Sequence, residues 1–204
     1  DKMAQLIPFM VFIWFALMSI PTGIFQDRMG KKLTVNIGMI LTGIGLLIPF
    51  VYYTLPTALI GFALLGIGNT ILQVSANPLL IDISAKDSKA ANLSLSQLIK
   101  AIASMLGPII TAGLALYLGN WKIVFPLFAA ISFISALWLS MVKIDESKPK
   151  KAPATFKSSF ALLKHPYILI TIIAIFFMVG FDVAMNTNIA TFLTSTFSIS
   201  LEAA

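Results

Sequence analysis

Six long apolar stretches dominate this sequence of 204 residues. Each reaches the roughly 20 residues that an α-helix needs to cross the hydrocarbon core of a bilayer. Only 11% of the residues are charged, whereas about a quarter are charged in a typical soluble domain. A hydrophobic content of 58% also excludes a disordered chain, because such a chain would collapse in water. The sequence therefore predicts an all-α, polytopic integral membrane protein. The predicted spans cover about 6–26, 33–53, 56–82, 93–119, 123–143 and 167–195.

The basic residues indicate how these spans are oriented. Eleven of the 14 lysine and arginine residues follow the first, third or fifth span, whereas Lys2 and Lys122 lie on the other side and Lys100 lies inside the fourth span. By the positive-inside rule, the segments after these three spans are cytoplasmic. We expect a location in a bacterial inner membrane. Because Asp1 then lies outside and is not a Met, we expect a fragment that lacks a helix before Asp1 and more after Ala204, the alternative being a complete six-helix protein.

The substantial linker in the sequence covers residues 144–166. It begins with prolines and lysines that are typical of a flexible, solvated segment. Phe156, Phe160 and Leu163 then recur at helical spacing, which predicts a short helix on the inner membrane surface. We therefore expect three parts: an N-terminal bundle over 1–143 without its first helix, an inter-bundle linker over 144–166, and the first helix of a second bundle over 167–204.

Enzyme chemistry finds little support in this sequence. It has no cysteine, and its single histidine, His165, directly precedes Pro166. There is no HExxH or GxSxG motif and no cluster of histidines and acids that could hold a metal ion. We predict that the protein is not an enzyme and has no cofactor or metal site. The net charge of +6 is spread between the spans, so we do not expect a nucleic-acid partner.

The third span carries a row of amide side chains. Asn69, Gln73 and Asn77 are spaced by four residues and so share one face of a helix. Pro78 follows, and it leaves the carbonyl of Val74 without its backbone donor. Because amides both donate and accept hydrogen bonds, this row could bind a polyhydroxylated ligand. The alternative is hydrogen bonding between helices.

The fourth span contains a lysine that is costly to insert. Gln97, Lys100 and Ser104 share a face, and an ammonium at the centre of a span costs about 2.5–3.5 kcal/mol. We expect Lys100 to pair with a carboxylate in a cavity. The alternative is a side chain that extends to the cytoplasmic surface.

The last span holds the one deeply placed acid, Asp182, with Asn186 one turn further on. A carboxylate inside a span is costly in its charged form, so Asp182 is a candidate for protonation. The alternative is a fixed ion-pair partner for Lys100 or another basic residue.

Residues 23–32, GIFQDRMGKK, resemble the loop signature G-x-x-x-D/N-R-x-G-R/K-R/K between the second and third helices of the major facilitator superfamily. The resemblance implies a helical bundle of that superfamily, of which this chain covers about helices two to seven. It also implies a gate that latches one conformation. The gate residues that it assigns are Gly23, Asp27, Arg28, Gly30 and Lys31.

Within that superfamily, three stretches are similar to the fucose–galactose–glucose:proton symporter family. They are GIGNTILQVSANP at 66–78, NLSLSQ at 92–97 followed by Gly107-Pro108, and FMVGFDV at 177–183. The resemblance implies sugar-binding or proton-coupling roles near Gln73, Asn77, Gln97 and Asp182. This chain departs from the family at two positions: it has Gln73 where fucose-type members carry Glu, and Lys100 where Asn is more usual.

Together, these patterns predict a secondary transporter that moves a monosaccharide or related polar solute with protons, by alternating access. Asp182 is the predicted proton-coupling residue. The predicted solute ligands are Asn69, Gln73, Asn77, Gln97, Lys100 and Asn186. One alternative is a transporter or facilitator of a carboxylated solute that uses Lys100. A second alternative is a membrane sensor that binds without transporting.

Overall fold

The computed structural model describes residues 6–146 and 154–197, apart from the side chains of residues 6–8, 186, 187, 190 and 191. The chain divides into two compact units, Asp1–Ala154 and Thr155–Ala204. The predicted division into two bundles joined by a linker over 144–166 stays a prediction. Part of that linker, residues 147–153, lies outside the described residues.

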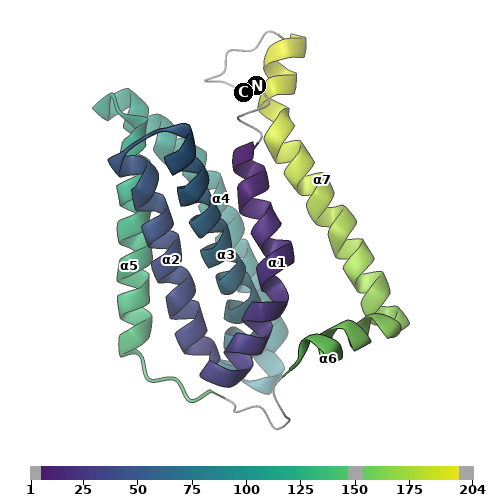
Figure 1. The fold of residues 1–204 in the computed structure, drawn as a ribbon. Coiled ribbons are helices and arrows are strands. Elements are labelled where there is room, and N and C mark those ends of the chain that lie inside the picture. Colours follow the sequence, from purple (N-terminus) through teal and green to yellow (C-terminus); the bar gives the residue numbers. More distant parts are fainter. Residues whose placement is uncertain (1–5, 147–153, 198–204) are drawn as a thin grey trace. The chain divides into compact units, whose positions relative to one another are not determined.

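Every long element of the described chain is an α-helix (Figure 1). Six of these helices are long and apolar enough to cross a membrane, which confirms the predicted all-α polytopic fold. The first unit contains α1 (Leu6–Met29), α2 (Lys31–Val51), α3 (Leu55–Ile83), α4 (Lys89–Leu118) and α5 (Val124–Met141), with 3₁₀ turns at Lys86–Ser88 and Trp121–Ile123. The second unit contains α6 (Phe156–Ala161), a 3₁₀ turn (Leu162–Lys164) and α7 (Pro166–Phe197).

The first connection is much shorter than the sequence predicts. Helix α1 continues to Met29 and α2 begins at Lys31, so the expected loop consists of Gly30 alone. Gly30 has φ +96°, a conformation that a residue with a Cβ rarely adopts. Asp27 and Lys31 therefore lie in helix ends and not in a loop. We call this end of the first unit its inner end, after the predicted orientation.

Helices α2 and α3 pack with their backbones in contact. A Cβ at Gly45 would lie 2.8 Å from the carbonyl oxygen of Gly61, and one at Gly68 would lie 2.8 Å from that of Gly38. No side chain fits at such distances without a shift of the backbone. As in other membrane helix pairs, small residues allow the close approach.

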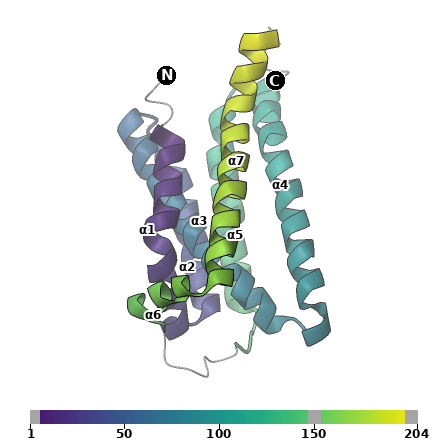
Figure 2. The ribbon, with the colours of Figure 1, turned by 90° about the vertical axis from the view of Figure 1, so that its right-hand side faces the viewer.

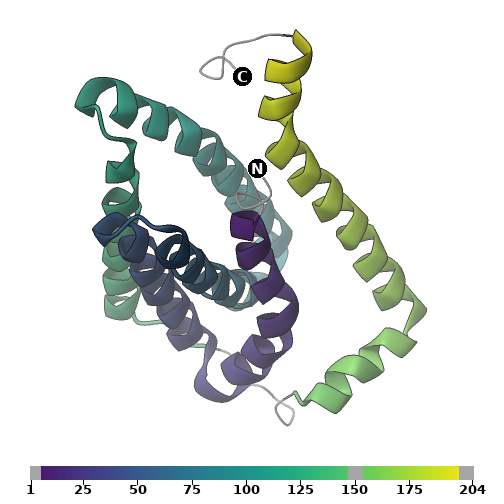
Figure 3. The same cartoon turned by 45° about the horizontal axis from the view of Figure 1, so that its top comes forward.

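The helices of the first unit are packed to different degrees. Helix α3 packs against α1 and α2, and α2 also packs against α5 (Figures 1 and 3). Helix α3 has eight buried residues, including Thr70 and Ser75, whereas α4 has none. Figure 2 shows α4 standing apart from α1 and α2. The first unit therefore has a close-packed core formed by α1, α2, α3 and α5.

Contacts near its two ends connect α4 to the rest of the first unit. At the inner end, Asn92 Nδ2 donates a hydrogen bond to Ser84 Oγ at 2.8 Å. Beyond the outer end, the Trp121 ring meets the Tyr53 ring edge-on, with centroids 5.5 Å apart, and Lys122 Nζ lies 4.8 Å from the Tyr53 ring centroid. Between these contacts, the first half of α4 borders a pocket with α3.

Candidate functional site

A pocket of about 450 Å³ lies between α3 and α4. It adjoins the glycine contacts with α2, because Leu72 lines the pocket and also lies beside Gly38 of α2. Its walls carry five polar side chains with amide or ammonium groups. The lining residues are Asn69, Leu72, Gln73, Ala76, Asn77 and Leu80 of α3, and Ser96, Gln97 and Lys100 of α4.

The amide row of α3 forms one wall of this pocket. Helix α3 continues through Pro78 to Ile83, so the four-residue spacing keeps Asn69, Gln73 and Asn77 on one face. Asn69 is half-buried, whereas Gln73 and Asn77 are exposed. The sequence prediction that these three residues share a surface therefore agrees with the structure.

The opposite wall comes from α4 and includes Gln97 and Lys100, both exposed. Ser104, which the helical spacing places on the same face, does not line the pocket. Its hydroxyl donates to the Lys100 carbonyl of its own helix at 2.9 Å. No acidic side chain lines the pocket. Lys100 gives this wall a positive charge.

The predicted pairing of Lys100 with a carboxylate stays a prediction. Within the described part of the first unit, the ion pair joins Lys31 to Asp82, and no acidic side chain lines the pocket beside Lys100. Asp182 and Asn186 both lie on α7, in the second unit, and the side chain of Asn186 is outside the described part of the chain. Their predicted roles stay predictions.

The amide groups of this pocket are not used in contacts between the described helices. None of Asn69, Gln73, Asn77 and Gln97 makes a side-chain hydrogen bond within the described residues; the polar contact from α4 to the end of α3 is instead made by Asn92. Unused donors and acceptors beside an ammonium can bind a solute that carries several hydroxyl groups, or one that carries a negative charge.

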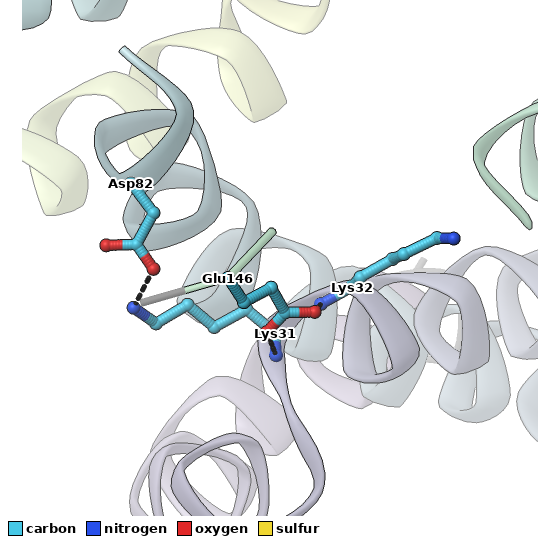
Figure 4. Close-up of polar contacts among 4 residues, drawn as sticks. All are labelled: Lys31, Lys32, Asp82 and Glu146. Atoms are coloured by element: carbon cyan, nitrogen blue, oxygen red, sulfur yellow. Dashed lines mark hydrogen bonds and ion pairs between the residues drawn. The ribbon is translucent and has the colours of Figure 1, made fainter. Parts of the chain in front are cut away.

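A second group of polar residues joins three helix ends at the inner end of the first unit. We call it the inner corner; its members are Asp27, Lys31, Lys32, Asp82 and Glu146. Lys31 Nζ contacts Asp82 Oδ2 at 2.5 Å, with side chains 18% and 14% exposed (Figure 4). This ion pair joins the first turn of α2 to the last turn of α3.

Hydrogen bonds in the inner corner join the start of α2 to the end of α5 and to the segment that follows α5. The carboxylate of Glu146 accepts hydrogen bonds from the backbone amides of Lys31 at 2.5 Å and Lys32 at 2.8 Å (Figure 4). In return, Lys32 Nζ donates to the carbonyls of Ser140 at 3.0 Å and Val142 at 2.7 Å, where α5 ends. An anion at the start of one helix and a cation at the end of another are both favourable with respect to the helix dipoles.

The predicted gate residues differ in the contacts that they make in the inner corner. Asp27 Oδ2 accepts a hydrogen bond from the Ala154 amide at 3.2 Å, and a Cβ at Gly30 would lie 3.2 Å from the Glu146 carboxylate. Lys31 forms the ion pair. Arg28 is exposed and has no hydrogen-bond or ion-pair partner among the described residues, and a Cβ at Gly23 would meet no described atom within 4 Å.

Three members of the inner corner were not predicted as gate residues from the sequence: Lys32, Asp82 and Glu146. Each lies within a few residues of a predicted helix end, where charged side chains often interact with the ends of other helices. That signal was present in the sequence. It could not identify the partners, because Glu146 and Lys31 are 115 residues apart along the chain.

Comparison with known proteins places this geometry in context. The family model of the Major Facilitator Superfamily matches residues 2–204. Relatives named "Glucose/galactose transporter" from two strains of Brucella abortus are 26% identical over 204 residues, which is 94% of this chain and 50% of each relative. An "Uncharacterized MFS-type transporter" of Methanocaldococcus jannaschii is 32% identical over 128 residues, which is 60% of this chain and 30% of that protein. The chain thus spans about half the length of the Brucella relatives.

Proposed function

The chain belongs to the major facilitator superfamily, and on this premise we propose that the protein transports a monosaccharide or a related small polar solute across the membrane. The names of the Brucella relatives support a sugar as the solute. The six apolar helices and the family indicate a multi-pass integral membrane protein, and the family supports a transporter rather than an enzyme.

The observation that carries this proposal is the pocket between α3 and α4. Its four amides and the ammonium of Lys100 make no side-chain hydrogen bond or ion pair with a described residue of the first unit. A sugar presents hydroxyl groups that donate and accept at once, and amide side chains match both functions. Gln73, Asn77, Gln97, Lys100 and Asn69 would be the solute ligands in this pocket. Asn186 stays a proposed ligand on the basis of the sequence alone.

The proposed mechanism is alternating access coupled to protons. Asp182 would take up the proton, since a charged carboxylate is unfavourable within a span. The inner corner would act as the latch of one conformation. Its contacts support this role, because a few residues there hold the ends of α2, α3 and α5 together.

A second candidate function is transport of a carboxylated solute, such as an acidic sugar. It is favoured by one observation: Lys100 lines the pocket, and no acid of the pocket neutralises it. The carboxylate of the solute would then pair with the Lys100 ammonium, and the amides would bind its hydroxyl groups.

Uptake by the full-length protein in proteoliposomes tests both candidates. We expect an inward proton gradient to stimulate uptake of a radiolabelled neutral monosaccharide, and Asp182→Asn to remove that stimulation. Uptake of acidic sugars alone, lost in Lys100→Asn but kept in the control Lys86→Asn, would establish the second candidate instead. Lys86 is an exposed cation just before α4 and does not line the pocket. Solute binding without flux of any of these sugars would contradict transport and favour a sensor.

A further inference from the structure

A separate cavity of about 290 Å³ lies among α1, α2 and α3. It shares no lining residue with the pocket between α3 and α4. Apart from two threonines, all of its lining side chains are apolar. The lining residues include Met18, Thr22 and Phe25 of α1, Thr34 and Ile37 of α2, and Ile71 of α3.

The cavity contains a polar group that lacks a partner. Thr22 is only 3% exposed, and its Oγ1 has no hydrogen-bond partner among the described residues. By contrast, the hydroxyl of Thr34, which is 1% exposed, donates to the Gly30 carbonyl at 2.6 Å. One turn further along α1, Gln26 Oε1 is also buried without a partner in the described structure. Buried polar groups are normally hydrogen-bonded, so the Thr22 hydroxyl indicates a missing partner.

Water is a poor occupant for this cavity. A buried water molecule typically needs two to four polar partners, and the wall offers little beyond the free Thr22 hydroxyl. An apolar cavity of about 150 Å³ is large enough to bind benzene, so this cavity has room for a substituted ring. Its volume and its lining side chains suit a molecule with an apolar body and one hydrogen-bonding group.

We infer that the cavity among α1, α2 and α3 is a binding site for a small neutral amphiphile of the alcohol or phenol class. The apolar body would contact Met18, Phe25, Ile37 and Ile71, and its hydroxyl would pair with Thr22 Oγ1. Phe25 and Met18 of α1 are partly exposed, so such a molecule could enter the cavity past these two side chains. The proposed binding does not rest on the proposed transport, because the two pockets share no lining residue.

The probe is 4-fluorobenzyl alcohol, titrated into the full-length protein in lipid nanodiscs and followed by ¹⁹F NMR. Empty nanodiscs measure its partition into lipid. We expect a saturable component with the protein. Thr22→Val, which keeps the shape but removes the hydroxyl, should weaken the affinity about twofold to tenfold, as expected for one hydrogen bond.

Two cavity-filling variants, Ile71→Phe and Ile37→Phe, come from different walls, and each should remove the saturable component. Thermal unfolding shows which of them is folded, and the folded one is used. The control, Ile102→Phe, adds the same ring at an exposed position of α4 and should bind as the parent does. The inference is overturned if the parent shows only lipid partition, as it would if another segment of the protein fills the cavity. It is also overturned if all variants bind alike.

Discussion

One face of α3 packs against α2 through glycines, and a neighbouring face borders a pocket through amides. At the first face, backbone atoms of the two helices lie so close that a Cβ on Gly45 would be 2.8 Å from Gly61 O. At the second, Gln73 and Asn77 are exposed and have no hydrogen-bond partner among the described residues. A single helix thus combines a contact that fixes its position with a surface that is open to a solute. Close packing at one face of α3 holds the helix in place while its amide side chains stay unpaired at the neighbouring face.

Substitution of Gly45 by Leu should have the largest effect, because it breaks the close-packed face. The new side chain would collide with backbone atoms of Gly61 and Leu65, which cannot move aside as a side chain can. We expect a loss of about 3 kcal/mol or more in the free energy of unfolding. The matched control is Gly113→Leu on α4, where a Cβ meets no described atom within 4 Å. Denaturant unfolding in detergent measures both, and equal losses would contradict the comparison.

Substitution of Gln73 by Leu should break the polar face instead. It removes a donor and an acceptor from the pocket wall while keeping a side chain of similar size. We expect kcat/KM for solute uptake to fall about tenfold to a hundredfold, as when a buried polar group of a ligand loses its partner. The melting temperature should stay within a few degrees of the parent value. A large drop in melting temperature with uptake retained would show that Gln73 serves packing and not solute binding.

Removal of the ion pair at the end of α3 should have a smaller effect on the free energy of unfolding. Asp82→Asn removes the charge that faces Lys31, and we expect a coupling energy of about 1 kcal/mol between the two positions in a double-mutant cycle with Lys31→Met. The readout is the free energy of unfolding at low and high salt. A coupling near zero would mean that this ion pair does not hold the inner corner closed.

Of these substitutions, Ser75→Ala should have the smallest effect on the free energy of unfolding. Ser75 is fully buried in α3, and its Oγ has no partner among the described residues. Removing this hydroxyl should leave the protein as stable as before or raise its free energy of unfolding by up to about 1 kcal/mol. Uptake should be unchanged, since Ser75 does not line the pocket. A destabilisation above about 1 kcal/mol would reveal a partner for the hydroxyl, such as a buried water.

Much of the fold follows from the sequence because span length and hydropathy depend on local composition. All six spans were predicted with ends close to those observed, and the amide row of α3 was predicted from its four-residue spacing. The contact of Glu146 with the start of α2 could not be predicted, because it joins segments far apart in the chain. The same holds for the glycine contacts of α2 with α3. Helix-end positions were missed at Gly30, where hydropathy does not reveal that a single residue suffices for the turn.

The way in which α4 is held near its two ends has a mechanical consequence. Gln97 and Lys100 lie between the Asn92 contact and the Tyr53–Trp121 contact, in a helix that has no buried residue and can therefore bend more easily than a packed one. The α3 wall, by contrast, is fixed by its glycine contacts with α2. Solutes of different width would therefore displace the α4 wall and not the α3 wall. If the protein transports a solute as proposed, the amides of α3 would set the position at which it binds, and the stiffness of α4 would set how large it can be.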